Sequence, residues 1–119
     1  MTENFNIPLI HELYELYKLS RKDVKNFTKT EKYDLGQKIK SLIIEMMEIT
    51  FDALICLKNQ KIITVRKLSN KNDLLKLLIR LCYDEKIINQ KEYLTFQKRL
   101  QTIGKMIGSW LKSLNKQEM

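Results

Sequence analysis

The chain has 119 residues, and its 22 Lys and Arg residues outnumber its 14 Asp and Glu residues, which gives a net charge of +8. Hydrophobic residues make up 44% and charged residues 30%, a balance typical of one domain with a single core. One Pro and three Gly residues are too few for the many tight turns of an all-β fold, so we expect long helices. The positive charge favours anionic partners, nucleic acid above all, although lysine-rich chains also arise without such a partner.

No segment indicates secretion or a membrane span. The N-terminus lacks the basic stretch and apolar run of a signal peptide, and no segment reaches eighteen uncharged apolar residues. Cys56 and Cys82 form no CxxC motif and have no neighbouring His, so we expect them on core faces in a reducing compartment. The sequence therefore predicts a cytoplasmic protein with a single domain over residues 1–119.

Two helices are predicted in the first half of the chain. The first begins near Pro8, because a fixed φ and a missing N–H are tolerated in a first turn, and it covers residues 8–25. Thr28 and Glu31 follow with the spacing of a capping box, in which each side chain bonds the other residue's backbone N–H. The second helix is predicted over residues 30–58, on a stripe of apolar residues: Leu35, Ile39, Leu42, Met46, Ile49, Ala53 and Leu57.

Residues 59–70 interrupt this pattern, since they are polar and basic apart from the β-branched run Ile62–Val65. We interpret them as a connection, with a fragment of helix or strand as the alternative. The third helix, residues 71–86, has apolar side chains nearly all round, which predicts burial on more than one side. Asn89 and Glu92 repeat the capping pattern and open the fourth helix, residues 90–114.

The fourth helix has one apolar seam with alternating spacings of three and four: Tyr93, Phe96, Leu100, Ile103, Ile107, Trp110 and Leu114. It also contains Gly104 and Gly108, and each Gly inside a helix costs about 0.8–1 kcal/mol relative to Ala. Close packing, within the chain or between subunits, would explain the pair; toleration on a solvated face is the alternative. Together the four segments predict an all-α, antiparallel four-helix bundle that forms an oligomer.

The sequence offers no site for catalysis or for a metal ion. His11 is the only histidine and has no partner at ligand spacing, so we interpret it as structural. Glu45, Glu48 and Asp52 share one helix face, but among so many lysines an ion-paired surface is favoured over a metal site. The chain has no P-loop, no Gly-rich dinucleotide turn and no nucleophile with a recognisable base. We therefore expect no enzymatic activity and no cofactor.

Two cations on the third helix are the strongest candidates for contacts with nucleic-acid phosphates. Lys76 and Arg80 lie one turn apart on the only polar strip of this helix, and Arg can bind phosphate with two donors. Three further cations precede them and extend the predicted patch: Arg66, Lys67 and Lys71. Because few aromatic residues lie outside the predicted core, we expect contacts led by the phosphate backbone, with weak sequence preference.

Lysines seven residues apart follow the outer side of the fourth helix: Lys91, Lys98, Lys105 and Lys112. Such a line can follow a phosphate backbone, and we include Lys98 and Lys105 among the predicted nucleic-acid-binding residues. The alternative is that outward lysines only keep the helix soluble.

Three blocks of the chain resemble one family of small four-helix proteins. Ile103–Leu114 resembles the family's "IGRMLGGWLKSL" ending, Phe27–Ile39 its "FPKxxRYxLGxxI" block, and Leu75–Ile88 its "LRxLLRLAxDLKLI" block. Members include the accessory variability determinants of diversity-generating retroelements and proteins encoded in intervening sequences of bacterial ribosomal RNA genes. The chain departs from the pattern at Thr28, where Pro is usual, at Ser109, where Gly is usual, and in having Lys for several arginines.

The resemblance implies a barrel-like homopentamer of four-helix bundles with a basic surface. In the retroelement branch, it implies an accessory protein that binds RNA or DNA and the element's reverse transcriptase, and so supports mutagenic retrohoming. By position, Lys76 and Arg80 match the basic residues of the family's third helix associated with binding, while Gly104, Gly108 and Trp110 would be structural.

Two alternatives stay open at this point. The protein could belong to the ribosomal intervening-sequence branch, whose role is undefined, or it could be a purely structural oligomer whose charge keeps it soluble.

Overall fold

The structure, a computed structural model, describes residues 3–118 and the side chains of residues 8–116. Within this range the chain is helical and has no strand. Its elements are α1 (Glu3–Val24), the one-turn α2 (Lys29–Glu31), the π-helical η1 (Lys32–Gly36), α3 (Gln37–Ile55), α4 (Lys58–Asp84) and α5 (Gln90–Glu118). Because α2, η1 and α3 follow one another without a break, the chain forms four long helical rods.

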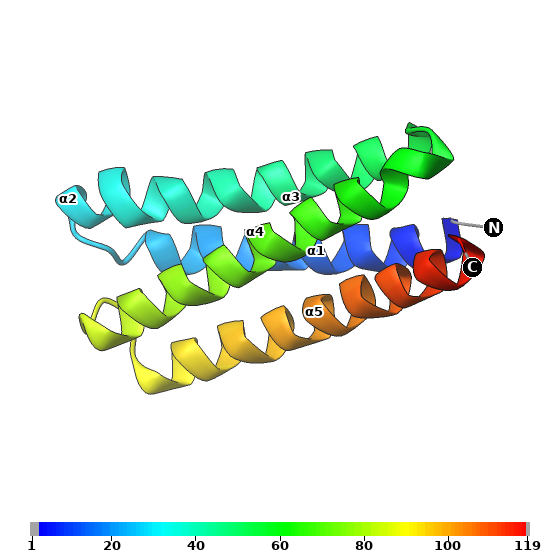
Figure 1. Ribbon diagram of the computed structural model, residues 1–119. Helices are drawn as coiled ribbons and strands as arrows, with labels where there is room; N and C mark the ends of the chain where they lie inside the picture. Colours follow the sequence, from blue (N-terminus) through cyan, green and yellow to red (C-terminus); the bar gives the residue numbers. More distant parts are fainter. Residues whose placement is uncertain (1–2, 119) are drawn as a thin grey trace.

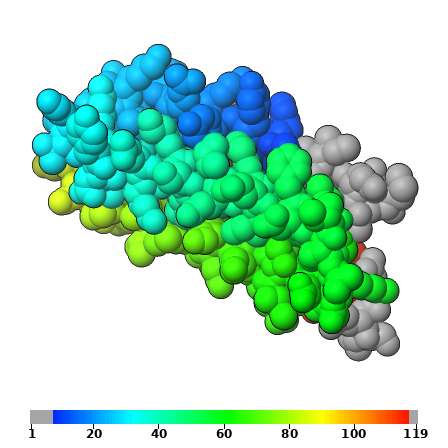
Figure 2. Space-filling model, turned by 90° about the horizontal axis from the view of Figure 1, so that it is seen from above, coloured from blue at the N-terminus to red at the C-terminus, as the bar shows by residue number. Residues whose placement is uncertain are grey.

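The four rods pack side by side as an up-and-down antiparallel bundle with a long axis of 48 Å (Figure 1). α3 packs against α1 and α4, and α5 packs against α4 and α1, so each rod has two neighbours. Figure 2 shows one such face, with α1, α3 and part of α4 lying next to one another. The predicted all-α four-helix bundle is confirmed.

The core lies along the bundle axis and is built from the predicted seams. All seven seam residues of α5 are buried, from Tyr93 at 9% exposure to Ile103 at 0%. α1 contributes Leu9, Leu13 and Leu16, which are fully buried at spacings of four and three. The periodicity of the sequence thus identifies the buried side of α1, α3 and α5. Leu57, predicted on the stripe of the second helix, is the exception: it is 71% exposed, because it lies in the turn after α3.

Both predicted capping boxes are present. The Glu31 backbone N–H donates to the Thr28 hydroxyl at 3.2 Å, and the Thr28 N–H donates to the Glu31 carboxylate at 3.0 Å. At the start of α5, the Asn89 N–H donates to the Glu92 carboxylate at 2.9 Å, and the Glu92 N–H donates to the Asn89 side-chain oxygen at 2.8 Å. These bonds satisfy N–H groups that have no partner inside the helix, and they fix where two of the rods begin.

The interpretation of residues 59–70 as a connection is wrong, because α4 runs unbroken through them. The turn between α3 and α4 is only Cys56 and Leu57, whose backbones are extended, so the second rod ends at Ile55 instead of residue 58. Ile62 and Val65 are buried and begin the stripe that continues along α4. Their burial outweighs the few tenths of a kcal/mol by which β-branched residues disfavour a helix.

The first helix also starts earlier than predicted. α1 begins at Glu3, and Pro8 lies inside it instead of at its start. The fixed φ of proline is compatible with a helix, but its missing N–H removes one hydrogen bond to the carbonyl four residues earlier.

The three glycines differ in what surrounds them. A Cβ added to Gly36 would lie 2.7 Å from the Val24 Cγ1 atom, so this glycine allows η1 to approach α1 closely. A Cβ on Gly104 would lie 3.4 Å from the Asn72 Nδ2 atom, an ordinary contact, and one on Gly108 would meet no atom within 4 Å. Packing within the chain therefore explains Gly36, whereas Gly108 lies on an open face.

One side of α4 is apolar and exposed. Leu77 is 65% exposed, Leu81 42% and Leu74 37%, and the three lie three and four residues apart. The bundle covers only the opposite stripe of α4, so the predicted burial on a second side is not provided within the single chain.

Candidate functional site

Arg80 lies on the exposed surface of α4, next to the start of α5. Its Nε atom donates to the Asp84 carboxylate at 2.9 Å, and its guanidinium lies 6.0 Å from the centre of the Tyr93 ring. Hydrogen bonding toward Tyr93, and then to Asp84, raises the pKa of Arg80 above its ordinary value. Arg80 is thus held in place and stays charged, although Asp84 offsets part of that charge.

Lys76 lies one turn before Arg80 and reaches over α5. Its amine lies 3.6 Å from the position that a Cβ on Gly104 would take, and it lines a shallow groove with Gln97 and Gln101. Among the side chains that the structure describes, no carboxylate lies within ion-pair distance of Lys76. Lys76 is therefore the member of the predicted pair with the freer charge.

The other predicted cations of α4 do not form one patch with Lys76 and Arg80. Lys71 turns toward α3, where its amine lies 3.6 Å from the Glu45 carboxylate. Arg66 and Lys67 are exposed and make no ion pair within residues 8–116. Lys71 thus lies on the side of α4 that faces α3, whereas Lys76 lies on the side that faces α5.

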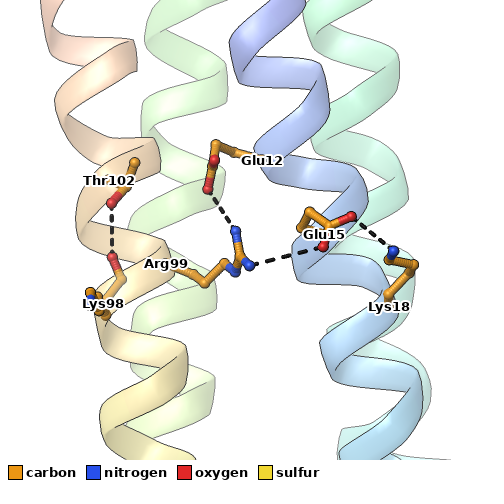
Figure 3. Close-up of polar contacts among 6 residues, drawn as sticks. All are labelled: Glu12, Glu15, Lys18, Lys98, Arg99 and Thr102. Atoms are coloured by element: carbon orange, nitrogen blue, oxygen red, sulfur yellow. Dashed lines mark hydrogen bonds and ion pairs between the residues drawn. The ribbon is translucent and has the colours of Figure 1, made fainter.

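Lys98 and Lys105 are exposed on the outer side of α5, as predicted. On the neighbouring side of α5, carboxylates of α1 offset the positive charge of Arg99. Figure 3 shows Arg99 reaching from α5 to α1, where its guanidinium lies 3.0 Å from the Glu12 carboxylate and 4.0 Å from that of Glu15. Lys18 pairs with Glu15 at 2.9 Å, and this hydrogen bond lowers the pKa of Glu15. These contacts join α1 to α5 and leave Lys98 at the edge of a mixed-charge surface.

A second basic surface, which the sequence analysis missed, lies at the end of the bundle where α1 meets α2 and η1. It is an open groove of about 450 Å³, called the end groove below, and its lining residues are Arg21, Val24, Lys25, Lys29, Lys32, Tyr33, Gln37 and Lys40. Arg21 lies in the last turn of α1 and Lys25 directly after its end, and the other cations follow one side of the next rod. These positions are visible in the sequence, but the adjacency of the two segments comes only from the fold.

The described part of the chain holds no group of three His, Cys, Asp or Glu side chains arranged to bind a metal ion. His11 is exposed on α1. Cys82 is buried, as predicted, and burial raises its pKa to about 11, so its thiol stays protonated at neutral pH. Cys56 is half-buried at the end of α3.

None of the described helices combines the length and the apolar character needed to cross a membrane.

A family described as bAvd-like matches residues 9–114 of the chain, while no curated protein and no solved structure matches it. The matched range begins at Leu9, which is buried in α1, and ends at Leu114, which is buried in α5. It therefore includes all four rods, both capping boxes and both basic surfaces. The resemblance to accessory variability determinants is confirmed at the level of the family: the chain belongs to the bAvd-like family.

Proposed function

We propose that this protein is a non-enzymatic accessory subunit of a diversity-generating retroelement. It binds RNA or DNA through its basic surface and associates with the element's reverse transcriptase. The observation that carries the proposal is the family match over all four rods, since the family is named for the accessory variability determinants of such elements. The net charge of +8 supports an anionic partner.

Lys76 and Arg80 are the residues we assign to phosphate contacts. Both are exposed on α4, and Lys76 has no carboxylate partner among the described side chains. Lys98 and Lys105 add positive charge on the outer side of α5. Contacts of this kind release counterions and carry little sequence information, so binding should weaken steeply with salt.

We also propose that the protein acts as a homo-oligomer, with five subunits as the number that the family resemblance implies. The support from geometry is the apolar stripe of Leu74, Leu77 and Leu81, which the single chain leaves exposed. Contiguous apolar surface of this kind marks interaction sites in proteins. A neighbouring subunit would bury it.

Binding to labelled RNA and DNA at several salt concentrations tests the nucleic-acid part of the proposal. Lys76→Ala/Arg80→Ala should weaken binding about tenfold and lower the slope of log affinity against log salt by about two. The matched control is Lys112→Ala/Lys116→Ala, which removes the same charge from exposed positions near the end of α5. Binding that does not depend on salt concentration, or an equal loss of affinity in the control variant, would contradict the assignment.

The retroelement part is tested by gene neighbourhood and by copurification. A reverse-transcriptase gene beside this one, with template and variable repeats, is the expected arrangement, and the tagged protein should retain that reverse transcriptase through purification. An open reading frame inside a ribosomal RNA gene would instead place the protein in the intervening-sequence branch.

A further inference from the structure

We propose that the end groove binds single-stranded nucleic acid, with phosphates against its cations and an unpaired base stacked on Tyr33. The inference rests on the nucleic-acid binding proposed above, and it adds a second site and a preference for unpaired strands. In Figure 2 the C-terminal part of α1 and the segment that follows it lie together at one end of the molecule.

The charge of the end groove is concentrated and unpaired. Five of its eight lining residues are cations, and none of them forms an ion pair with a side chain of residues 8–116. Of the acidic residues nearby, Glu31 accepts the Thr28 N–H of the capping box, and Asp34 does not line the groove. A concave surface lined by one sign of charge concentrates its field and attracts an anion.

The backbone gives the end groove a defined shape. Lys32 and Tyr33 belong to η1, and π-helical turns are rare and frequently occur at functional sites. The missing Cβ of Gly36 lets this segment approach Val24, which forms part of the groove wall. The volume of about 450 Å³ falls in the range of about 300–1,000 Å³ typical of ligand-binding clefts.

Tyr33 makes an unpaired base the favoured occupant. It is 68% exposed, more than any other aromatic residue with a described side chain, and cations surround it. Proteins that bind single strands combine a basic groove with aromatic rings on which bases stack. In a duplex both faces of each base are already stacked, so a ring at this position would gain little from double-stranded nucleic acid.

The lysines are tested with fluorescein-labelled oligothymidine. Lys29→Ala/Lys32→Ala should weaken binding at least about tenfold and lower the salt slope by about 1.4, the value for two phosphate contacts on a single strand. The control, Lys22→Ala/Lys38→Ala, removes two exposed lysines of α1 and α3, and neither of these lysines lines the groove. The affinity of the control variant for oligothymidine should fall by less than about twofold.

Tyr33 is tested separately, because an aromatic contact should not follow charge. Tyr33→Ala should weaken binding of oligothymidine about tenfold but leave binding of an abasic oligonucleotide unchanged, and Tyr33→Phe should bind like the wild type. All these side chains are exposed, so the variants should keep the helical circular dichroism and thermal midpoint of the wild type.

The outcomes separate the two proposals. If Lys76→Ala/Arg80→Ala weakens binding while the groove variant matches its control, the groove inference is wrong and the proposed function stands. A wild type that binds no oligonucleotide would overturn both. Displacement of oligothymidine by polyglutamate at equal charge concentration, with Tyr33→Ala unaffected, would show that the groove takes acidic polypeptides and would overturn the inference.

Discussion

Gly36 and Gly108 are both helical, yet their surroundings predict opposite effects of adding a methyl group. Gly36→Ala would place Cβ 2.7 Å from Val24 Cγ1, and because the branched Val24 side chain has little freedom, α1 and η1 would have to move apart. We expect this variant to lower the free energy of unfolding by about 1–3 kcal/mol in urea denaturation.

Gly108→Ala is the matched comparison, since its Cβ would enter open space and the helix would gain about 0.8–1 kcal/mol of stability. Equal destabilisation by both substitutions would contradict the contact with Val24. If Gly108→Ala destabilised only the assembled protein, Gly108 would instead lie between subunits.

Asp23 predicts a dependence of stability on pH. Its side chain is 6% exposed, and its Oδ2 atom has no hydrogen-bond partner among the described residues. Burial first, and then the negative charge of Glu92, raises the pKa of Asp23 above its ordinary 3.8, against a smaller opposing effect of Lys22. Folding therefore favours the neutral carboxyl, and stability is lost as pH rises from about 3.8 through the folded pKa.

Asp23→Asn cannot ionise, so it should be more stable than the wild type at pH 7, and this difference should shrink as pH falls below about 4. Urea denaturation across this pH range measures the effect. Asp34→Asn, at an exposed position of η1, is the control. A difference that stays constant with pH would rule out ionisation of Asp23 as its cause.

At the scale of elements, Lys61 stabilises the tight turn between α3 and α4. Its amine donates to the Ala53 carbonyl at 2.7 Å and to the Leu54 carbonyl at 3.2 Å, and both carbonyls lie in the last turn of α3, where intrahelical partners are missing. Lys61→Met keeps the aliphatic stem and removes both donors. We expect it to lower the free energy of unfolding by about 1–2 kcal/mol.

Lys58→Met is the control for Lys61, because Lys58 is exposed in the first turn of the same helix. Comparable losses in the two variants, measured by urea denaturation, would mean that positive charge near the turn matters and the two hydrogen bonds do not.

The elements also show which parts of the fold the sequence can predict. The number of rods, most of the buried seams of α1, α3 and α5, and both capping boxes depend on residues within a few positions of one another, and these were predicted. The start of α4 was missed because the polar content of residues 59–70 obscured a stripe that already began at Ile62. The close approach of Gly36 to Val24 was missed because it depends on how the second rod packs against α1.

In the candidate site, too, features within one helix could be predicted, whereas contacts between rods could not. The exposure of Lys76 and Arg80 could be predicted from one helix, and so could the pairing of Arg80 with Asp84 four residues later. Two other features could not be predicted, because each requires knowing which rods are neighbours. They are the separation of Lys71 from Lys76 and the meeting of α1 with η1 in the end groove.

At the scale of the whole molecule, the exposed stripe on α4 predicts self-association that one substitution can prevent. Leu77→Glu would place an unpaired charge in the proposed interface, yet Leu77 is 65% exposed in the single chain, so the bundle itself should stay folded. Light scattering should give an oligomer for the wild type and a helical monomer for Leu77→Glu.

Leu94→Glu is the control for this stripe, because Leu94 is 55% exposed but lies on α5. It should leave the mass of the oligomer unchanged. A monomeric wild type would contradict the assembly proposal outright, and dissociation by Leu94→Glu alone would move the interface to α5.

The end groove lies at the opposite end of the bundle from the start of α1 and the end of α5 (Figure 1). In a cyclic assembly whose subunits stand side by side along their 48 Å axes, symmetry would place every groove on one rim. A strand held in one groove would then be at a high effective concentration for the next, so several weak contacts would combine into avidity. The affinity of the assembly for a long strand would thus exceed that of any single groove, and the opposite rim would remain free to carry a fused or tethered partner.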